Sequence, residues 1–159
     1  MRAEAGFGLI ELMIVVAIIA TLSLAAVMSL RAPHAHNPQN QARAFSQAIA
    51  FLRDEARYRA RDLGVSIEPG GWRSLVFDPE TQSWRARAAN SLHAQGDWPA
   101  QGHVRLELEG RPALLTSDAA PEIFVLSSGG MNAFRLTFGD QVMCDSDTTR
   151  LTCALDTRP

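Results

Sequence analysis

Residues 7–30 form an almost uncharged apolar run, FGLIELMIVVAIIATLSLAAVMSL, in which Glu11 is the single charged residue. A helix of about 24 residues rises ~1.5 Å per residue, so it would be about 36 Å long and would cross a hydrocarbon core of ~30 Å. A carboxylate near the centre of a bilayer costs ~2.5–3.5 kcal/mol, and less near the interface. The run therefore predicts a membrane-inserted helix in which Glu11 has a function.

Three interpretations of this run differ in how it is processed. A secretory signal peptide would be cleaved after the small residues at 23–25, but Glu4 and Glu11 are unusual in such a peptide. A plain signal anchor accounts for the length of the run and leaves Glu11 without a role. The third interpretation is a cut after Gly6, and it gives Glu11 a role.

The sequence around Gly6 resembles the processing site of type IV pilins and type II secretion pseudopilins. A leader of six residues ends at Gly6, the apolar run starts at Phe7, and Glu11 is the fifth residue after the cut. The resemblance implies that a prepilin peptidase removes residues 1–6 on the cytoplasmic face and that Phe7 is then N-methylated. Gly8 departs from the family, which often has Thr at that position.

Glu11 would then have a partner created by the cut, the new α-amino group of Phe7. Burying an amine and a carboxylate separately is costly, and pairing them offsets much of that cost. In a stack of subunits, Glu11 of one subunit could meet the amine of its neighbour and set the axial register. The alternative is a solitary carboxylate near the membrane surface.

Residues 33–38 interrupt the apolar pattern and predict a hinge. Asn37 suits a helix N-cap and Pro38 suits the first helical turn. His34 and His36 could bind a metal from a strand, but between these prolines we expect exposed linker residues.

An amphipathic helix is predicted over residues 39–63, with Gly64 as its stop. Its apolar positions recur at spacings of three and four, and they are Ala42, Phe45, Ile49, Leu52, Ala56 and Leu63.

Two features of the polar domain could mark contact surfaces. Arg53, Arg57 and Arg61 form a row at i, i+4 spacing. We expect this row to be a solvated helix flank; the alternative is a contact between subunits. Tryptophans are more often core or cross-strand residues, but Trp98 lies in a predicted loop over residues 89–101, so of the three it is the one we would expect to be exposed; if exposed, it would serve as an interface anchor.

The hydrophobic pattern after Gly64 has a period of two residues, which is typical of strands. With the helix, these strands predict an α+β domain in which a helix packs on an antiparallel sheet. The predicted strands begin at 65–67 and continue at 72–77, 83–88, 104–109, 123–126, 134–138, 141–144 and 151–155.

Residues 121–134, PEIFVLSSGGMNAF, are similar to a segment of general secretion pathway protein H and the related type IV minor pilins. Gly130 stands where those proteins often have an acidic residue. The resemblance implies a pilin-like fold with a transmembrane helix at 7–32. It also implies a single-pass protein of the bacterial inner membrane, with a cytoplasmic N-terminus and a periplasmic domain at 39–159.

The function implied by the resemblance is that of a minor pseudopilin of the type II secretion system. Such a subunit would lie near the tip of the pseudopilus and support export of folded proteins across the outer membrane. Its partners would be the prepilin peptidase, the major pseudopilin and the minor tip subunits. The alternative is a minor pilin of a type IV pilus, in pilus assembly or DNA uptake.

Other classes of function find little support. The net charge of −2 does not indicate a nucleic-acid-binding surface. The chain has no Walker loop, no HExxH and no CxxC motif, so we expect neither an enzyme nor a cofactor, although a periplasmic enzyme or binding domain on a signal anchor stays an alternative. Asp140, Asp145 and Asp147 could hold Ca²⁺, but their spacing is not that of an EF-hand, so we expect a solvated turn.

Cys144 and Cys153 are the only cysteines. They lie in the domain that a pilin-like topology places in the periplasm, where disulfides persist. The residues between them form a plausible turn, and opposed strands could bring the two sulfurs together. We expect a disulfide; the alternative is two unpaired, buried cysteines.

Overall fold

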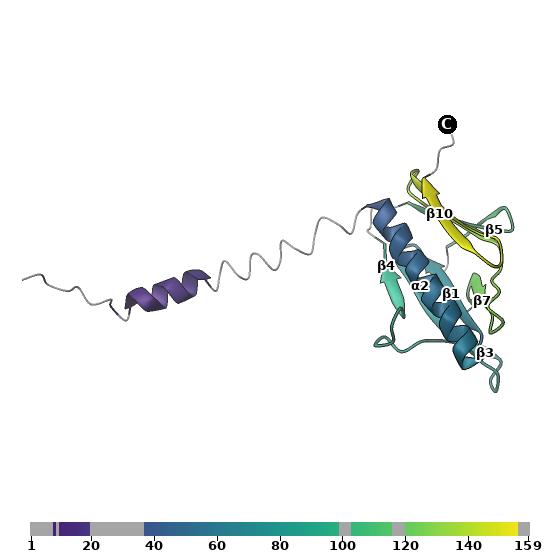
Figure 1. The fold of residues 1–159 in the computed structure, drawn as a ribbon, viewed down its shortest axis with the longest axis horizontal. Coiled ribbons are helices and arrows are strands. Elements are labelled where there is room, and N and C mark those ends of the chain that lie inside the picture. Colours follow the sequence, from purple (N-terminus) through teal and green to yellow (C-terminus); the bar gives the residue numbers. More distant parts are fainter. Residues whose placement is uncertain (1–7, 9, 20–36, 99–102, 116–119, 156–159) are drawn as a thin grey trace, which may run out of the picture. The chain divides into compact units, whose positions relative to one another are not determined.

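The computed structural model describes residues 8, 10–19, 37–98, 103–115 and 120–155. The chain divides into two units, residues 1–35 and 36–159, and each is described by itself (Figure 1). His34 and His36 of the predicted hinge lie outside the described residues.

The amphipathic helix α2 (Pro38–Arg59) begins as the sequence predicts. The Asn37 side chain caps it by accepting a hydrogen bond of 2.8 Å from the backbone N–H of Gln39, and Pro38 occupies the first turn. The helix ends at Arg59 rather than at Leu63, because Ala60 takes the left-handed conformation (φ 48°) and its N–H bonds back to the last turn. The side chains on its buried face are Ala42, Phe45, Ala48, Ile49, Leu52 and Ala56.

Gly64 was predicted to stop the helix, but it lies inside a strand. A Cβ atom at Gly64 would come within 2.4 Å of Cγ of Pro121 and 3.1 Å of the Trp84 ring. Glycine is needed here because the Pro121 ring packs directly on the backbone of the strand.

The first sheet has the strand order β3-β2-β1-β7, and β4 also pairs with β2. β2 and β3 were predicted as strands, and they pair as an antiparallel hairpin with Phe77 opposite Trp84. The short strand β4 was not predicted. The strands are β1 (Leu63–Glu68), β2 (Gly71–Asp78), β3 (Ser83–Ala86), β4 (Gln95–Asp97) and β7 (Ile123–Val125).

A second sheet has the order β10-β9-β8-β5-β6, all antiparallel. The sequence predicts most of these strands but places them in one sheet with the others, and it misses β6. The strands are β5 (Val104–Leu108), β6 (Arg111–Ala113), β8 (Phe134–Phe138), β9 (Val142–Ser146) and β10 (Leu151–Leu155).

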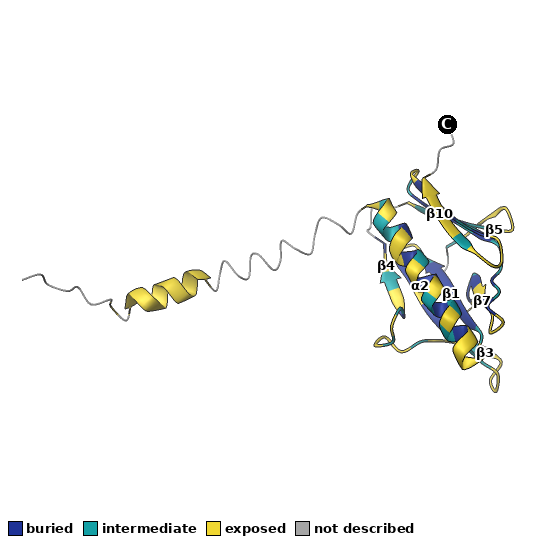
Figure 2. Cartoon of the chain, in the orientation of Figure 1, coloured by how far each residue is buried: buried dark blue, intermediate teal, exposed yellow. Residues whose placement is uncertain are grey.

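The core lies where α2 packs against both sheets (Figure 2). Phe45 of α2 is fully buried, and its ring centroid lies 6.1–6.3 Å from four other aromatic rings. These four rings come from Trp72, Trp98, Phe134 and Phe138.

Trp98 is therefore not the exposed anchor that the sequence suggests. Its side chain is buried against Phe45 and Phe138, and its indole N–H donates a hydrogen bond of 3.1 Å to the carbonyl oxygen of Glu68. The hydrogen bond satisfies the one polar atom of the ring, which is what allows the indole to be buried.

We expect Gly64→Ala to destabilise the domain by about 1–3 kcal/mol, because the new methyl group overlaps the Pro121 ring. The measurement is urea unfolding of the full chain in detergent. Gly70→Ala is the matched control: a Cβ there meets no heavy atom within 4 Å, and Gly70 does not have a positive φ. Equal stability of the two variants would contradict the close approach of Pro121.

Candidate functional site

The predicted processing and assembly segment is described from Gly8 onward. Residues 10–19 are helical, and the carbonyl oxygen of Gly8 accepts hydrogen bonds from the backbone N–H groups of Glu11 (2.9 Å) and Leu12 (3.3 Å). Glu11 therefore lies in the first helical turn, where the helix dipole favours a carboxylate. Gly6 and Phe7, which flank the predicted cut, lie outside the described residues.

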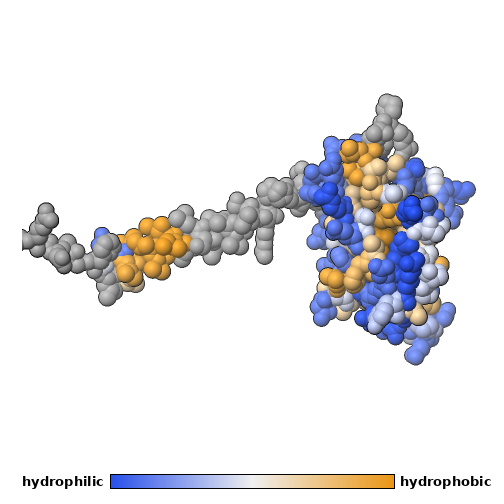
Figure 3. All heavy atoms as spheres, in the orientation of Figure 1, coloured by the Kyte–Doolittle hydropathy of each residue, from blue (hydrophilic) through white to orange (hydrophobic). Residues whose placement is uncertain are grey.

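The helix at 10–19 exposes a nearly continuous apolar surface, seen as orange atoms in Figure 3. Its large apolar side chains are 46–74% exposed. They are Ile10, Leu12, Met13, Ile14, Val15, Val16, Ile18 and Ile19. A contiguous apolar surface of this kind marks a contact with lipid or with other apolar helices.

Within the described part of the chain, no helix is both long enough and apolar enough to cross a membrane.

A disulfide joins Cys144 on β9 to Cys153 on β10, two residues that lie directly opposite each other with a Cα–Cα distance of 4.0 Å. Asp147 shapes the turn between the strands, because its Oδ1 accepts hydrogen bonds from the N–H groups of Arg150 (2.8 Å) and Thr149 (3.1 Å). These bonds favour the charged form and hold the pKa of the Asp147 carboxyl below its usual value.

The three aspartates considered for Ca²⁺ are not brought together. Asp140 pairs with Arg105 at 2.7 Å and Asp145 with Arg135 at 2.6 Å, while Asp147 is bound to its own turn. Each carboxylate already has a protein partner of its own.

The arginine row on α2 has more contacts than a solvated flank would have. Arg53 donates hydrogen bonds from Nε (3.2 Å) and Nη2 (3.1 Å) to the carbonyl oxygen of Gly129. Arg57 lies over the same glycine, whose φ is +86°, and a Cβ at that position would overlap the guanidinium. Asp62, which follows α2, adds a contact with the same turn, because its side chain accepts a hydrogen bond of 2.7 Å from the backbone N–H of Ser127. Arg53 and Arg57 therefore tie α2 to the turn between β7 and β8, whereas Arg61, the third member of the predicted row, lies beyond the end of α2.

An ion-pair cluster near the end of α2 could not be predicted as a unit. Glu55 pairs with Arg59 at 3.1 Å, and this i, i+4 pair is visible in the sequence. Glu55 also pairs with Arg87 at 2.6 Å, and the Arg87 side chain is only 9% exposed. Arg87 is 32 residues away, so only the fold brings it to the helix.

Solved structures from Vibrio cholerae and Escherichia coli have a similar fold. The minor pseudopilin EpsH from the type 2 secretion system of *Vibrio cholerae* superposes with a TM-score of 0.66 at 20% identity, covering 77% of this chain and 98% of that one. *Escherichia coli* GspH superposes with a TM-score of 0.61 at 20% identity, covering 76% and 91%. These likenesses confirm the α+β pseudopilin fold.

Curated relatives are similar over most of the chain. Type II secretion system protein H of *Pseudomonas aeruginosa* is 31% identical over 152 residues, covering 89% of this chain and 86% of that protein. The protein of the same name from *Klebsiella michiganensis* is 25% identical over 156 residues, covering 87% and 85%.

Two family descriptions match separate parts of the sequence. Residues 1–27 match the prokaryotic N-terminal methylation motif, and residues 41–156 match the type II transport protein GspH. The second match spans most of the chain and coincides with α2 and both sheets. The chain therefore belongs to the type II transport protein GspH family.

Proposed function

We propose that this chain is a minor subunit of the type II secretion pseudopilus, with a structural rather than a catalytic role. The observation that carries the proposal is the helix at 10–19, which exposes its apolar side chains and has Glu11 in its first turn. Such a helix gains stability only when another apolar surface covers it. The subunit would lie near the tip and support the export of folded proteins across the outer membrane.

Maturation would begin at the membrane. A prepilin peptidase would cut after Gly6, and Phe7 would then be methylated at its new amino group. Residues 7–32 would cross the inner membrane once, with the N-terminus in the cytoplasm and residues 39–159 in the periplasm. The match of residues 1–27 to the N-terminal methylation motif supports this order of events.

Assembly would depend on Glu11. Glu11 lies in the first turn of an apolar helix, and its carboxylate would enter a bundle of such helices at a high desolvation cost. Pairing with the Phe7 amine of a neighbouring subunit would offset that cost and would set the axial register, while the apolar side chains cover each other.

The type IV pilus alternative is not supported. The curated relatives that match are type II secretion proteins, and the GspH family match covers the whole folded domain.

Gly6→Val should block maturation, because the peptidase is expected to need a small residue before the cut. The expected product in the membrane fraction is a precursor that keeps its six leader residues, detected by mass spectrometry. Gly8→Thr is the control, because it lies after the cut and a Cβ there meets no heavy atom within 4 Å. Normal processing of Gly6→Val would contradict the assigned site.

Glu11→Leu should keep membrane insertion and cleavage but lose assembly. An apolar side chain replaces a carboxylate, so insertion is at least as favourable as in the wild type. The Phe7 amine would enter the bundle unpaired, and breaking a buried pair costs about 3–5 kcal/mol. The measurement is co-purification with the major pseudopilin after detergent extraction.

Two controls accompany this variant. Glu11→Asp keeps the charge and should retain part of the assembly, whereas Met13→Leu changes an exposed apolar side chain without changing charge and should assemble normally. Wild-type recovery of Glu11→Leu would show that Glu11 is a bystander and that the folded domain alone recruits the subunit.

We also propose that Cys144 and Cys153 are oxidised in the mature protein. Alkylation of the denatured, non-reduced chain should then label neither cysteine, and labelling of both would refute the bond. Cys144→Ser with Cys153→Ser should loosen the β9–β10 hairpin and cost ~2–3 kcal/mol in the chain-entropy model. Urea unfolding of the double variant, compared with the oxidised chain, measures this loss.

A further inference from the structure

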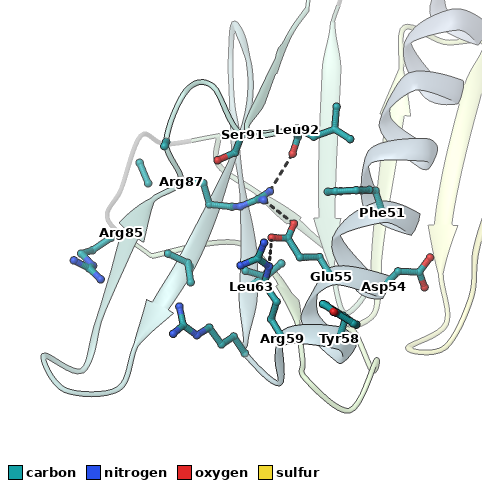
Figure 4. A pocket seen from close by; sticks show the side chains of 14 residues that line it. Phe51, Asp54, Glu55, Tyr58, Arg59, Leu63, Arg85, Arg87, Ser91 and Leu92 are labelled. Atoms are coloured by element: carbon teal, nitrogen blue, oxygen red, sulfur yellow. Dashed lines mark hydrogen bonds and ion pairs between the residues drawn. The ribbon is translucent and has the colours of Figure 1, made fainter.

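A groove of about 760 Å³ lies between the C-terminal half of α2 and β3 with the segment that follows it (Figure 4). We name it the α2–β3 groove. Neither the family match nor the assembly role proposed for Glu11 assigns it a function. Its walls combine apolar side chains with arginines, and some side chains of each kind, such as Tyr58 and Arg85, are exposed.

The apolar part of the groove is open to water. Tyr58, on the α2 side, is 91% exposed, and Leu92, on the opposite side, is 63% exposed. Phe51 and Val76 line the space between them and are half-buried. A partner that covered these side chains would gain roughly 25 cal/mol for each Å² of apolar surface removed from water.

The charged part of the groove is mainly basic. Four arginines and two carboxylates line it, whereas the whole chain has a net charge of −2. Glu55 is shared by Arg59 and Arg87, so one carboxylate faces two guanidinium groups. Arg85 pairs with Asp78 at 3.0 Å. Within the described residues, the Arg61 side chain has neither a hydrogen bond nor an ion pair.

The arginines alone would not indicate a partner. The negative end of the α2 dipole already stabilises cations in the last turn, where Arg57 and Arg59 lie. The groove is distinguished by an excess of arginines next to Tyr58 and Leu92, two large side chains that are exposed to solvent. A surface of that composition is complementary to a segment that carries both carboxylates and apolar side chains.

We propose that the α2–β3 groove binds an acidic segment of a neighbouring subunit in the filament. An apolar side chain of that segment lies between Tyr58 and Leu92, and its carboxylates accept hydrogen bonds from Arg59 and Arg61. Guanidinium groups suit this role because they bind carboxylates with two parallel hydrogen bonds. The inference rests on the proposed function, because it takes the partner to be another subunit of the same assembly.

Tyr58 allows a specific test, because it is the only tyrosine of the chain and its ring is almost fully exposed. The full chain with p-benzoylphenylalanine at position 58 is produced in its own bacterium with the secretion system intact. Ultraviolet light should then yield an adduct with another pseudopilus subunit. Mass spectrometry of the adduct should place the crosslink in a segment with at least two carboxylates beside an apolar residue.

Arg61→Glu in the same chain should lower the adduct yield roughly tenfold, as expected when one charge-assisted pair is replaced by repulsion. Its fold should be unchanged, because the Arg61 side chain has no partner among the described residues, and an unchanged unfolding temperature verifies this. Arg43→Glu makes the same charge change at an exposed position of α2 outside the groove, and it should keep the wild-type yield.

Co-purification with the major pseudopilin, measured in parallel, separates this inference from the proposed function. A chain that assembles but gives no adduct at position 58 would overturn the inference alone. So would an adduct with lipid or with a neutral or basic segment, or a yield that Arg61→Glu leaves unchanged. A chain that does not assemble at all would overturn both.

Discussion

Both sheets of the folded domain pack on the buried stripe of α2. Phe45 belongs to this stripe and contacts aromatic rings from the two sheets. Polar ties also hold the helix against the rest of the domain. Arg53 at the Gly129 turn and Glu55 at Arg87 are such ties, and both start from positions flanking the stripe.

The sequence predicts the elements of this domain better than their arrangement. Periodicity finds the α2 stripe and most strands, since burial on one face dictates the spacing of apolar residues. It cannot place the helix end at Arg59, because Ala60 rather than a glycine takes the left-handed conformation. It also misses β4 and β6, because neither of these three-residue strands contains a β-branched or aromatic residue, whereas β7, of the same length, consists of such residues. The division into two sheets depends on pairings between distant strands, which no local pattern reveals.

The candidate functional residues also differ in whether the sequence alone could predict them. Gly6, Phe7 and Glu11 are predicted from sequence alone, because the processing motif is a contiguous string of residue types at fixed spacing. The opposition of Cys144 and Cys153 follows from a short turn between two strands. The α2–β3 groove could not be found, because it joins α2 to residues some thirty positions later. Trp98 is a residue that the sequence suggests for a contact surface and that the structure places in the core. Its burial depends on a hydrogen bond from the indole N–H to the carbonyl oxygen of Glu68, which lies 30 residues earlier in the chain.

The outermost strands of the two sheets decide how readily the domain could pair with a strand of another chain. Exposed strand edges are templates for uncontrolled sheet growth, and natural proteins limit them with short strands, charges and proline. Here β6 and β7 have only three residues each, and Pro112 removes one backbone donor from β6. The edge strand β3 has four residues and carries Arg85. The edges at β3, β6 and β7 are thus poorly suited to pairing with a strand of another chain, whereas β10, at the other edge of the second sheet, is an uncharged strand of five residues that lacks these protections.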